Sequence, residues 1–420
     1  MKGKNLLSFL VILLTSFLPI YGIITPVIPS TRSISPSFKT FVFNPNADND
    51  FVIYTHDSFM AWGDSDDYDS VMNQTFYNFG LLHDVTVTVQ VFSGMVAALN
   101  VLISQKNAPR ADVVIGLDNT MVGRAKSEDI LLPLASEINL ENISSDLIAA
   151  LDPENYLLPI DYSLIALVFD TEYITNVTHP EITTLNFTSL LSTFGGDLAL
   201  QDPTQSATGL NFLLYQIIFY EEILGKDWQD WWQVARELVS IDKSWSDSWD
   251  RVFSTKEKHI MASYATDPAY NSFFGYSNEK NAALIHNNTD EYGWLQIEGI
   301  GVINGTSNET LAKEYVKYAL SLEVQNLTAT NNWMFPANTQ VALPTCYDYA
   351  ITTDDVIILN NMVSSDYINA NYQSWLNTWE RLIYGSSLWW AWVLIASAII
   401  LIGGITVYFI YRRKTKIDVE

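Results

Sequence analysis

The sequence is poor in cysteine, in basic residues and in low-complexity tracts. Cys346 is the only cysteine among the 420 residues, so neither an internal disulfide nor a thiol-rich metal site can form. Lysine and arginine number 22 against 47 aspartate and glutamate, and the net charge of −25 excludes a protein that tracks nucleic-acid phosphates. Because hydrophobic residues make up 48% of the chain, its middle should fold around sizeable apolar cores.

Common catalytic motifs are also missing. The chain has no Ser-His-Asp ordering, no H-E-x-x-H, no phosphate-binding P-loop and no Gly-rich dinucleotide fingerprint. The sequence therefore predicts a protein that is not an enzyme and that needs no cofactor and no metal.

Both ends of the chain are apolar. Lys2 and Lys4 precede an apolar run at 6–18, which is typical of a secretory signal, here placed at 1–22. Residues 388–410 are free of charge and long enough to cross about 30 Å of hydrocarbon. Four cations follow within the tail 411–420, which favours a cytoplasmic C-terminus. The sequence thus predicts a single-pass membrane protein whose body lies outside the cytoplasm.

An extracytoplasmic body is compatible with glycosylation. Eight Asn-x-Ser/Thr sequons occur, at Asn73, Asn142, Asn176, Asn186, Asn287, Asn304, Asn308 and Asn326. Several sequons arise by chance in an Asn-rich chain, so they permit this placement of the body without establishing it.

The body alternates strand and helix patterns. A Pro/Ser/Thr-rich stretch suggests a linker or arm at 23–50, and the fold is expected to begin near Phe51. Expected strands lie at 51–54, 85–91, 111–115, 163–169, 199–201 and 259–264, and expected helices at 70–79, 95–104, 209–224, 228–239, 308–322 and 367–382. This alternation indicates βαβ units around a mainly parallel sheet, in which ligands bind beyond the carboxyl ends of the strands.

The segments after the strands are polar or aromatic. They read YTHDSF (54–59), GLDNT (116–120), PIDY (159–162), QDPTQSATG (201–209), KSWS (243–246), SYATDPAY (263–270) and NWMFP (332–336). In this order, together with ADVVIGLDN at 111–119, they resemble the thiamine-binding periplasmic proteins of bacterial ABC importers. The resemblance covers residues 50–381.

The resemblance implies an α/β fold of the type II periplasmic-binding-protein class. Two lobes joined by crossing strands would close on ligand like a hinge, with lobe 1 at 51–157 and 295–381 and lobe 2 at 158–294. It further implies a monomeric solute-binding protein that delivers thiamine or its phosphates to an ABC permease in the same membrane.

Thiamine carries a flat aminopyrimidine and a cationic thiazolium, so its site needs aromatic faces, a carboxylate and polar groups. The residues that match family positions or fall in these segments are His56, Asp57, Trp62, Asp118, Asp161, Ser206, Thr208, Gly209, Trp245, Tyr264, Tyr270 and Trp333. Ordinary structural roles stay open for several: core packing for the tryptophans, and helix capping for Asp57, Ser206 and Thr208.

Two positions depart from the family. His56 stands where a stacking Tyr is usual, and Thr204 stands where Arg often follows Asp-Pro. A neutral His56 can stack and donate a hydrogen bond, whereas a protonated one would repel a thiazolium. The departure at His56 therefore bears on the identity of the ligand.

Four alternatives remain open from the sequence. A polyamine is also cationic and would suit aromatic and acidic side chains, but it has no use for a helix start that holds anions. A thiaminase-like enzyme on the same fold would need Cys346 as nucleophile, and no His or Glu lies near it in sequence. Iron binding would call for paired tyrosines and acids, which are not evident, and a surface receptor without a transporter also fits.

Overall fold

The described part of the chain comprises residues 38–134, 137–354 and 356–385 of the computed structural model and belongs to a unit that begins at Phe38. The predicted signal at 1–22 and the predicted span at 388–410 lie outside the described residues. Within the three described ranges, no helix is both long and apolar enough to cross a membrane.

The amino-terminal elements alternate much as the periodicity predicts. They are β1 (Phe38–Phe43), β2 (Asn49–His56), α2 (Tyr68–Met72), α3 (Asn78–His83), β3 (Val85–Phe92), α4 (Met95–Gln105), β4 (Val113–Asp118), α5 (Val122–Ser127) and α6 (Ser145–Leu151). β1 lies within the stretch 23–50 that the composition assigns to an arm. It pairs antiparallel with β3, and its Phe43 ring stacks on Phe76 at 5.4 Å.

The remaining elements begin with a long strand and end with a long helix. They are β5 (Leu158–Phe169), α7 (Phe187–Phe194), β6 (Leu198–Gln201), α8 (Ala207–Ile218), α9 (Gln229–Ala235), β7 (Ser240–Asp242), α10 (Trp245–Trp249), β8 (Ile260–Tyr264), α11 (Asp267–Phe273), β9 (Ala282–Ala283), β10 (Ile285–Asn287), β11 (Asp290–Val302), α12 (Glu309–Ala319), α13 (Leu322–Asn331), β12 (Phe335–Pro336), β13 (Ile357–Ile358) and α14 (Ser365–Tyr384). The 13-residue strand β11 was not predicted from the periodicity.

The strands of the described residues form one 13-stranded sheet whose main path runs β1-β3-β2-β4-β11-β5-β8-β6-β7. β2 is parallel to β3 and β4, and β6 is parallel to β7 and β8. β11 is antiparallel to both β4 and β5, and β5 is antiparallel to β8. The sheet is therefore mixed, and the prediction of a mainly parallel sheet is corrected, because two long strands of opposite direction occupy its centre.

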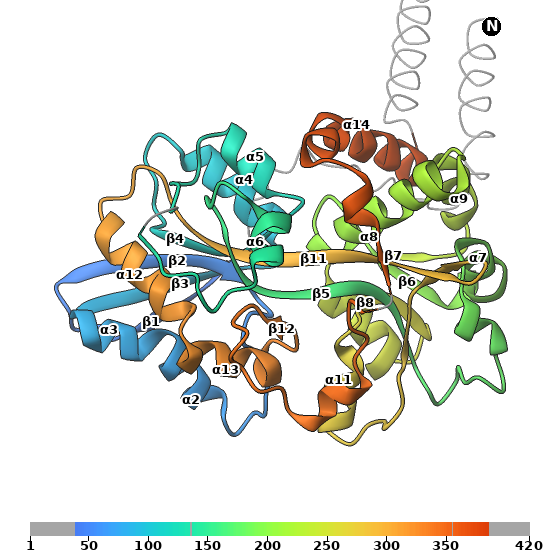
Figure 1. Cartoon of the computed structure of the whole chain (residues 1–420), viewed down its shortest axis with the longest axis horizontal. Helices are drawn as coiled ribbons and strands as arrows, with labels where there is room; N and C mark the ends of the chain where they lie inside the picture. Colours follow the sequence, from blue (N-terminus) through green and yellow to red (C-terminus); the bar gives the residue numbers. More distant parts are fainter. Residues whose placement is uncertain (1–37, 135–136, 355, 386–420) are drawn as a thin grey trace, which may run out of the picture. The chain divides into compact units, whose positions relative to one another are not determined.

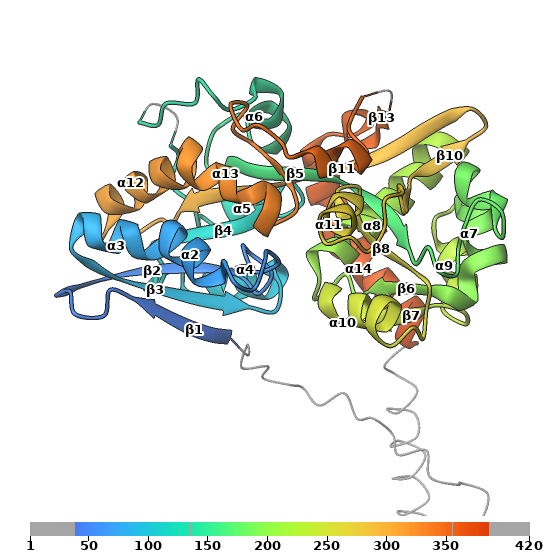
Figure 2. The ribbon, with the colours of Figure 1, turned by 90° about the horizontal axis from the view of Figure 1, so that it is seen from below.

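These two long strands connect two groups of elements (Figure 1). The first half holds β1 to β4 with α2 to α6, α12 and α13, and the second half holds β6 to β8 with α7 to α11 and α14 (Figures 1 and 2). β5 and β11 run from one half to the other. Their register sets Glu298 of β11 opposite Asp118 of β4 and opposite Asp161 of β5.

The core of each half lies against the sheet. All six residues of β4 and all four of β6 are buried, as expected for strands covered by helices on both faces. Phe51 and Ile53 of β2 are fully buried. Burying one such side chain contributes about 1.5–3 kcal/mol relative to leaving it in water.

Helix α14 packs on the second half. Its Trp379 is fully buried and meets Trp232 of α9 edge-to-face, with ring centroids 5.6 Å apart. At its end, the Tyr384 hydroxyl donates a hydrogen bond of 2.9 Å to Asp202, on the loop between β6 and α8. The helix thus ends in contact with the loop that leads to Ser206.

Candidate functional site

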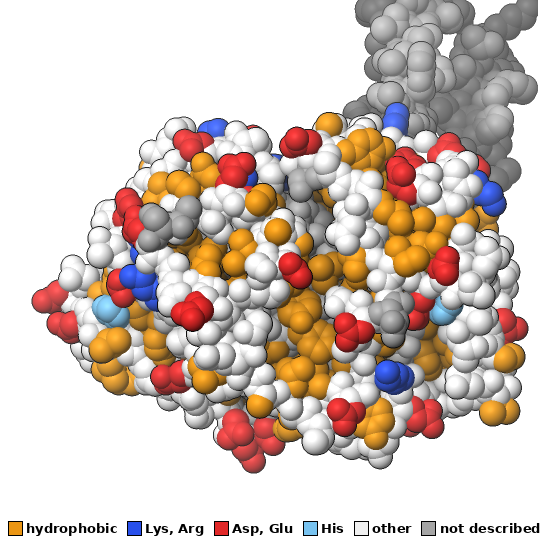
Figure 3. Space-filling model, viewed as in Figure 1, with side chains coloured by type: hydrophobic (Ala, Val, Ile, Leu, Met, Phe, Trp, Pro, Cys, Tyr) orange, Lys and Arg blue, Asp and Glu red, His pale blue; other side chains and the backbone are white. Residues whose placement is uncertain are grey.

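A cavity lies between the two halves and encloses about 860 Å³ of empty space, including the part that opens to solvent. On the face seen in Figure 3, hydrophobic side chains gather along the middle, over the junction of the halves. The cavity is lined by His56, Asp57, Ser58, Trp62, Ser93, Gly94, Met95, Ser206, Ala207, Thr208, Ser244, Trp245, Ser246, Trp249, Tyr264, Asp267, Tyr270, Glu298, Asn332, Trp333 and Met334.

One side of the cavity is a wall of aromatic rings from both halves. Trp62, on the loop after β2, meets Trp245 of α10 edge-to-face at 5.0 Å between ring centroids. Trp245 stacks on Trp249 at 5.1 Å, and Tyr270 meets Trp333 at 5.3 Å. Such pairs prefer these edge-to-face and offset geometries, so the rings hold one another in place. The wall is continuous across the junction of the halves.

Strained loops carry Trp62 and Trp333 of this wall. Met60, two residues before Trp62, and Trp333 itself have φ values of +54° and +55°, which are rare for bulky residues and cost about 1–3 kcal/mol each. The Trp333 indole Nε1–H donates to the Trp62 carbonyl oxygen at 2.7 Å, and the Met60 amide donates to Asn332 Oδ1 at 3.1 Å. Each loop is therefore fixed by the other, and this mutual bonding offsets the strain.

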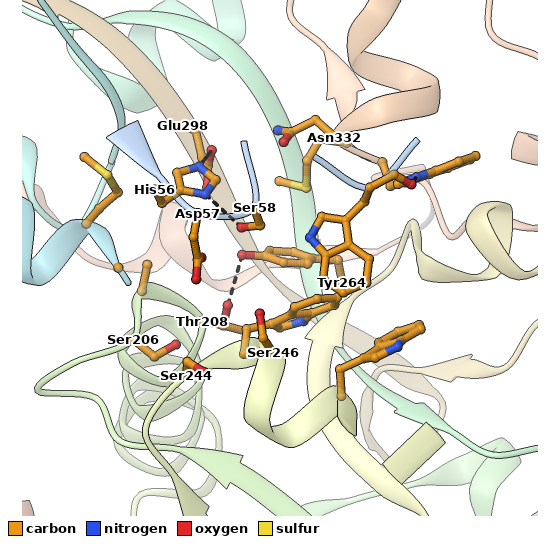
Figure 4. Close-up of a pocket in the computed structure, with 18 of the residues that line it drawn as sticks. His56, Asp57, Ser58, Ser206, Thr208, Ser244, Ser246, Tyr264, Glu298 and Asn332 are labelled. Carbon is orange, nitrogen blue, oxygen red and sulfur yellow. Dashed lines mark hydrogen bonds and ion pairs between the residues drawn. The ribbon is translucent and has the colours of Figure 1, made fainter. Parts of the chain in front are cut away.

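The opposite side carries hydroxyl groups and helix starts (Figure 4). Ser206 is the N-cap of α8 and accepts a hydrogen bond from the Gly209 amide at 3.3 Å. Gly94 is the N-cap of α4, and Ser244 caps α10, whose first residue is Trp245 of the aromatic wall. Thr208 Oγ1 and the Tyr264 hydroxyl lie 3.0 Å apart. Because helix starts expose unpaired N–H groups and carry partial positive charge, this side can hold an anion.

The two halves also touch on this side. A Cβ added at Gly94 of the first half would lie 2.6 Å from the carbonyl oxygen of Gln205 in the second half. Only the absence of a side chain at Gly94 allows this approach. The halves are thus in contact at the aromatic wall and again at the helix starts.

Acidic groups give the cavity its charge. Glu298 Oε2 lies 3.2 Å from His56 Nε2, and Ser58 Oγ lies 2.8 Å from His56 Nδ1. Burial alone would lower the pKa of His56, but the Glu298 carboxylate outweighs it and raises that pKa above its usual value. Burial also raises the pKa of Asp57, and it raises the pKa of Asp267 to about 7. Among the described residues that line the cavity, none is Lys or Arg.

Nine of the twelve predicted site residues line this cavity: His56, Asp57, Trp62, Ser206, Thr208, Trp245, Tyr264, Tyr270 and Trp333. Asp118, Asp161 and Gly209 do not. Gly209 is buried within α8, where an added Cβ would lie 2.5 Å from the Gln201 carbonyl oxygen, so it lets α8 pack close to β6.

The two excluded aspartates lie beneath the cavity, on the strands beside β11. The carboxylate of Asp118 is fully buried and accepts hydrogen bonds from Thr120 at 2.9 Å and Asn211 at 2.7 Å; burial raises its pKa to about 6. Asp161 accepts from Asn332 at 2.7 Å, and burial, followed by the nearby Glu298, raises its pKa well above the usual range. Asp161 is therefore placed to orient Asn332, which faces the cavity in its stead.

Twelve lining residues were not among the predicted ones: Ser58, Ser93, Gly94, Met95, Ala207, Ser244, Ser246, Trp249, Asp267, Glu298, Asn332 and Met334. Most fall inside the strand-end segments already singled out or directly follow β3, so the strand-end rule could have found them. Trp249 lies one helical turn after Trp245. Glu298 lies within the unpredicted strand β11, and only the tertiary structure reveals it.

No group of three or more His, Cys, Asp or Glu in the described ranges could hold a metal ion. Cys346 does not line this cavity; it is buried in the cluster that also contains Trp333, and burial raises the pKa of its thiol.

Solved structures share the architecture. A periplasmic thiamin binding protein matches with a TM-score of 0.65 at 23% identity, over 80% of this chain and 96% of that one. The periplasmic binding protein AfuA from Actinobacillus pleuropneumoniae matches with a TM-score of 0.62 at 15% identity, over 80% and 99%. At these identities the likeness establishes the fold, a mixed α/β periplasmic-binding-protein fold.

Curated relatives align over most of the body. A thiamine-binding periplasmic protein of Brucella melitensis is 27% identical over 339 residues, which cover 79% of this chain and 92% of the relative. A thiamine-binding periplasmic protein of Escherichia coli is 26% identical over 338 residues, covering 79% and 93%.

The localisation predicted from the sequence needs correction. The relatives are named as periplasmic proteins, which contradicts the predicted localisation in a cell membrane. That prediction rests on the length and lack of charge of 388–410 and on the four cations that follow, and these residues lie outside the described ones.

A family model matches residues 75–354, which include the whole of β5 and β11 and most of the cavity wall. That model describes a bacterial extracellular solute-binding protein. The chain belongs to the bacterial extracellular solute-binding protein family.

Proposed function

We propose that this chain binds thiamine or its phosphate esters and delivers them to the permease of an ABC importer. The observation that carries the proposal is the lining of the cavity. It combines an aromatic wall with acidic side chains, and helix starts lie on the opposite side. None of its described residues is Lys or Arg. The curated relatives, which are named for thiamine binding, support the same ligand class.

The aromatic and acidic groups suit the cationic part of the ligand. A cation over a Trp face gains about 0.5–2 kcal/mol, and more when water is excluded. Trp62, Trp245 and Trp333 offer ring edges and faces to the cavity, while Asp57 and Asp267 supply negative charge. We propose that the thiazolium and aminopyrimidine lie against this wall.

The helix starts suit a phosphate. Ser206 and Thr208 present hydroxyls at the start of α8, and Ser244 at the start of α10. We propose that the phosphate of thiamine monophosphate lies here, with Ser206 and Thr208 as its contacts. Gly209 would act through the backbone of α8, since it does not line the cavity.

We propose further that the two halves are the lobes of a type II binding protein that closes about β5 and β11 as a hinge. The lobe boundaries are those indicated by the sequence, near residues 157 and 294, except that α14 is assigned to the second lobe because of its packing against Trp232. The protein is proposed to work as a monomer.

A polyamine is the second candidate ligand, because the acidic and aromatic lining would also suit an ammonium chain. The helix starts favour thiamine phosphate, since a polyamine has no anionic group to place there. A thiaminase-like activity gains no support, because Cys346 does not line the cavity.

Native mass spectrometry of the chain purified without refolding, followed by calorimetry with thiamine, thiamine monophosphate and spermidine, tests the proposal. Co-purification of a thiamine-class molecule and saturable binding of thiamine are expected. Binding of spermidine without thiamine would replace the proposed ligand.

A further inference from the structure

The indole of Trp245 is held by a chain of hydrogen bonds that passes through a residue outside the cavity lining. Its Nε1–H donates to Ser263 Oγ at 2.7 Å, and the Ser263 hydroxyl donates in turn to Asp267 Oδ2. Ser263 on β8 is fully buried and does not line the cavity, whereas Asp267, at the start of α11, is 5% exposed and does. The hydroxyl thus receives one hydrogen bond and gives one, which polarises both in the same direction.

This relay of two hydrogen bonds adds a directional restraint to the packing of the Trp245 ring. Trp245 contacts Trp249 and Trp62 through its faces and edges, and such contacts tolerate rotation about the broad second side-chain torsion of Trp. A directional bond at Nε1 selects one orientation. The Ser263–Asp267 bond is strongest when Asp267 is ionised, because hydrogen bonds to a carboxylate are roughly twice as strong as neutral ones. The serine oxygen, polarised by that bond, then accepts more strongly from the Trp245 indole.

The surroundings of Asp267 make its ionisation sensitive to pH near neutrality. Burial raises the pKa of Asp267 to about 7, against the opposing hydrogen bonds from Ser263 and from the Tyr264 backbone. The titratable groups that face it are phenols: Tyr264 of β8, Tyr270 of α11 and Tyr347 beside α11. Burial raises the pKa of all three above the usual value for Tyr, so they stay neutral while Asp267 titrates. The charged groups elsewhere in the same cavity are Asp57 and the His56–Glu298 pair.

We infer that Ser263 is a positioning residue, through which the Asp267 carboxylate fixes the ring of Trp245 at the cavity wall. The inference rests on the proposed function for the identity of the ligand, but the relay itself is a property of the unliganded protein. It assigns Ser263 a role in recognition although its side chain does not line the cavity.

The chain offers a matched control. Ser163 of β5 is also buried, at 1% exposure, and its Oγ lies 3.1 Å from Thr266 Oγ1, one residue before Asp267. Ser163→Ala and Ser263→Ala each remove one buried hydroxyl beside the start of α11, but only Ser263→Ala breaks a bond to an indole.

The first experiment records indole ¹⁵N–¹H spectra of the full-length chain without ligand, with the Trp245 resonance assigned by Trp245→Phe. That resonance should shift with pH, with a midpoint near 7, in the parent protein and in Ser163→Ala. In Ser263→Ala it should lie elsewhere and lose this pH dependence, and Asp267→Asn, which keeps the serine, should also abolish it. If neither Ser263→Ala nor Asp267→Asn changes the position or the pH dependence of the Trp245 resonance, the inference is wrong.

The second experiment measures thiamine affinity by calorimetry. Ser263→Ala should weaken binding about three- to tenfold, the range expected for loss of one buried hydrogen bond, while Ser163→Ala should leave it unchanged. Ser263→Thr, which keeps the hydroxyl, should restore most of the loss. Equal losses in the two alanine variants would assign both serines to the stability of the α11 region and overturn the inference. If the parent protein shows the pH-dependent indole shift but does not bind thiamine, the proposed function fails and the relay stands.

Discussion

The two sides of the cavity are built in different ways. On the aromatic side, rings from both halves pack on one another, and the loops that carry Met60 and Trp333 are held in strained conformations by mutual hydrogen bonds. On the other side, short polar side chains and backbone amides stand at the start of α8. The first side is ordered by side-chain packing and the second by helix geometry. Changes on the two sides should therefore affect different parts of one ligand.

The largest effect is expected on the aromatic side. Trp245→Ala and Trp333→Ala should each weaken thiamine binding at least about tenfold, or about 1.4 kcal/mol, because each removes a ring from the wall that faces the cation. Calorimetry with thiamine measures this loss, and circular dichroism checks that the fold persists. Unchanged affinity in both variants would show that these rings only pack in the core, and the proposed difference between the two sides of the cavity would be wrong.

A charge at the helix starts should act on the phosphate alone. Ser206→Asp places a carboxylate where an ester phosphate would lie, so it should weaken thiamine monophosphate about fivefold more than thiamine. Ser254→Asp, at an exposed position outside the cavity, is the control for added charge. Equal losses for both ligands, or none, would leave Ser206 with only its capping role.

Contact between the halves should matter to both ligands equally. The φ of Gly94 is 177°, an extended value that any residue adopts, so Gly94→Ala tests the contact with Gln205 without backbone strain. The added methyl should hold the halves apart and weaken thiamine and its monophosphate alike, by about threefold to fivefold. A loss confined to the ester would mean that Gly94 contacts the phosphate instead.

The smallest effect concerns pH. The pKa of His56 is raised by Glu298, so His56 stays protonated somewhat above its usual range and adds positive charge beside a cationic ligand. As pH rises from 6 to 8 Asp267 ionises, and His56 loses its charge as pH rises through its own raised pKa; both changes favour a cation, so thiamine affinity should rise about threefold. His56→Gln should flatten part of this slope in calorimetric titrations at the two pH values. An affinity that falls with rising pH would contradict the assignment of charges.

The sequence predicts the elements that carry a clear period and misses those that do not. β2, β3, β4 and α8 were found because apolar residues recur at strand or helix spacing and polar turns follow them. β11 was missed because it is buried on both faces and holds Gly293, Gly299 and Gly301, so it lacks alternation and carries residues that strands disfavour. The mixed sheet follows from that one strand and could not be predicted without it.

The same distinction between local patterns and distant contacts applies to the residues of the site. Residues at strand ends could be found by a topological rule, and the structure brings nine of them around one cavity. Asp118 ends β4 and satisfies the same rule, whereas Asp161 lies inside β5; Asn211 of α8 and Asn332 donate hydrogen bonds to their carboxylates. These partners are 93 and 171 residues away in sequence, so no local pattern reports them. Glu298 lines the cavity although no local pattern marks it, because it lies on β11 where that strand passes between the halves.

The hydrogen bond from Tyr384 to Asp202 makes the end of α14 a suitable site for a fluorescent dye that reports on the turn before Ser206. Asp202 also accepts from Thr204 and Gln205, so it organises the whole turn that leads to Ser206. Any rearrangement of that turn on ligand capture reaches the last turn of α14 through a single bond. Because Cys346 is 8% exposed and is the sole cysteine of the chain, Arg381→Cys would give one accessible thiol for an environment-sensitive dye. The chain labelled at that position could therefore serve as the binding component of a fluorescent sensor.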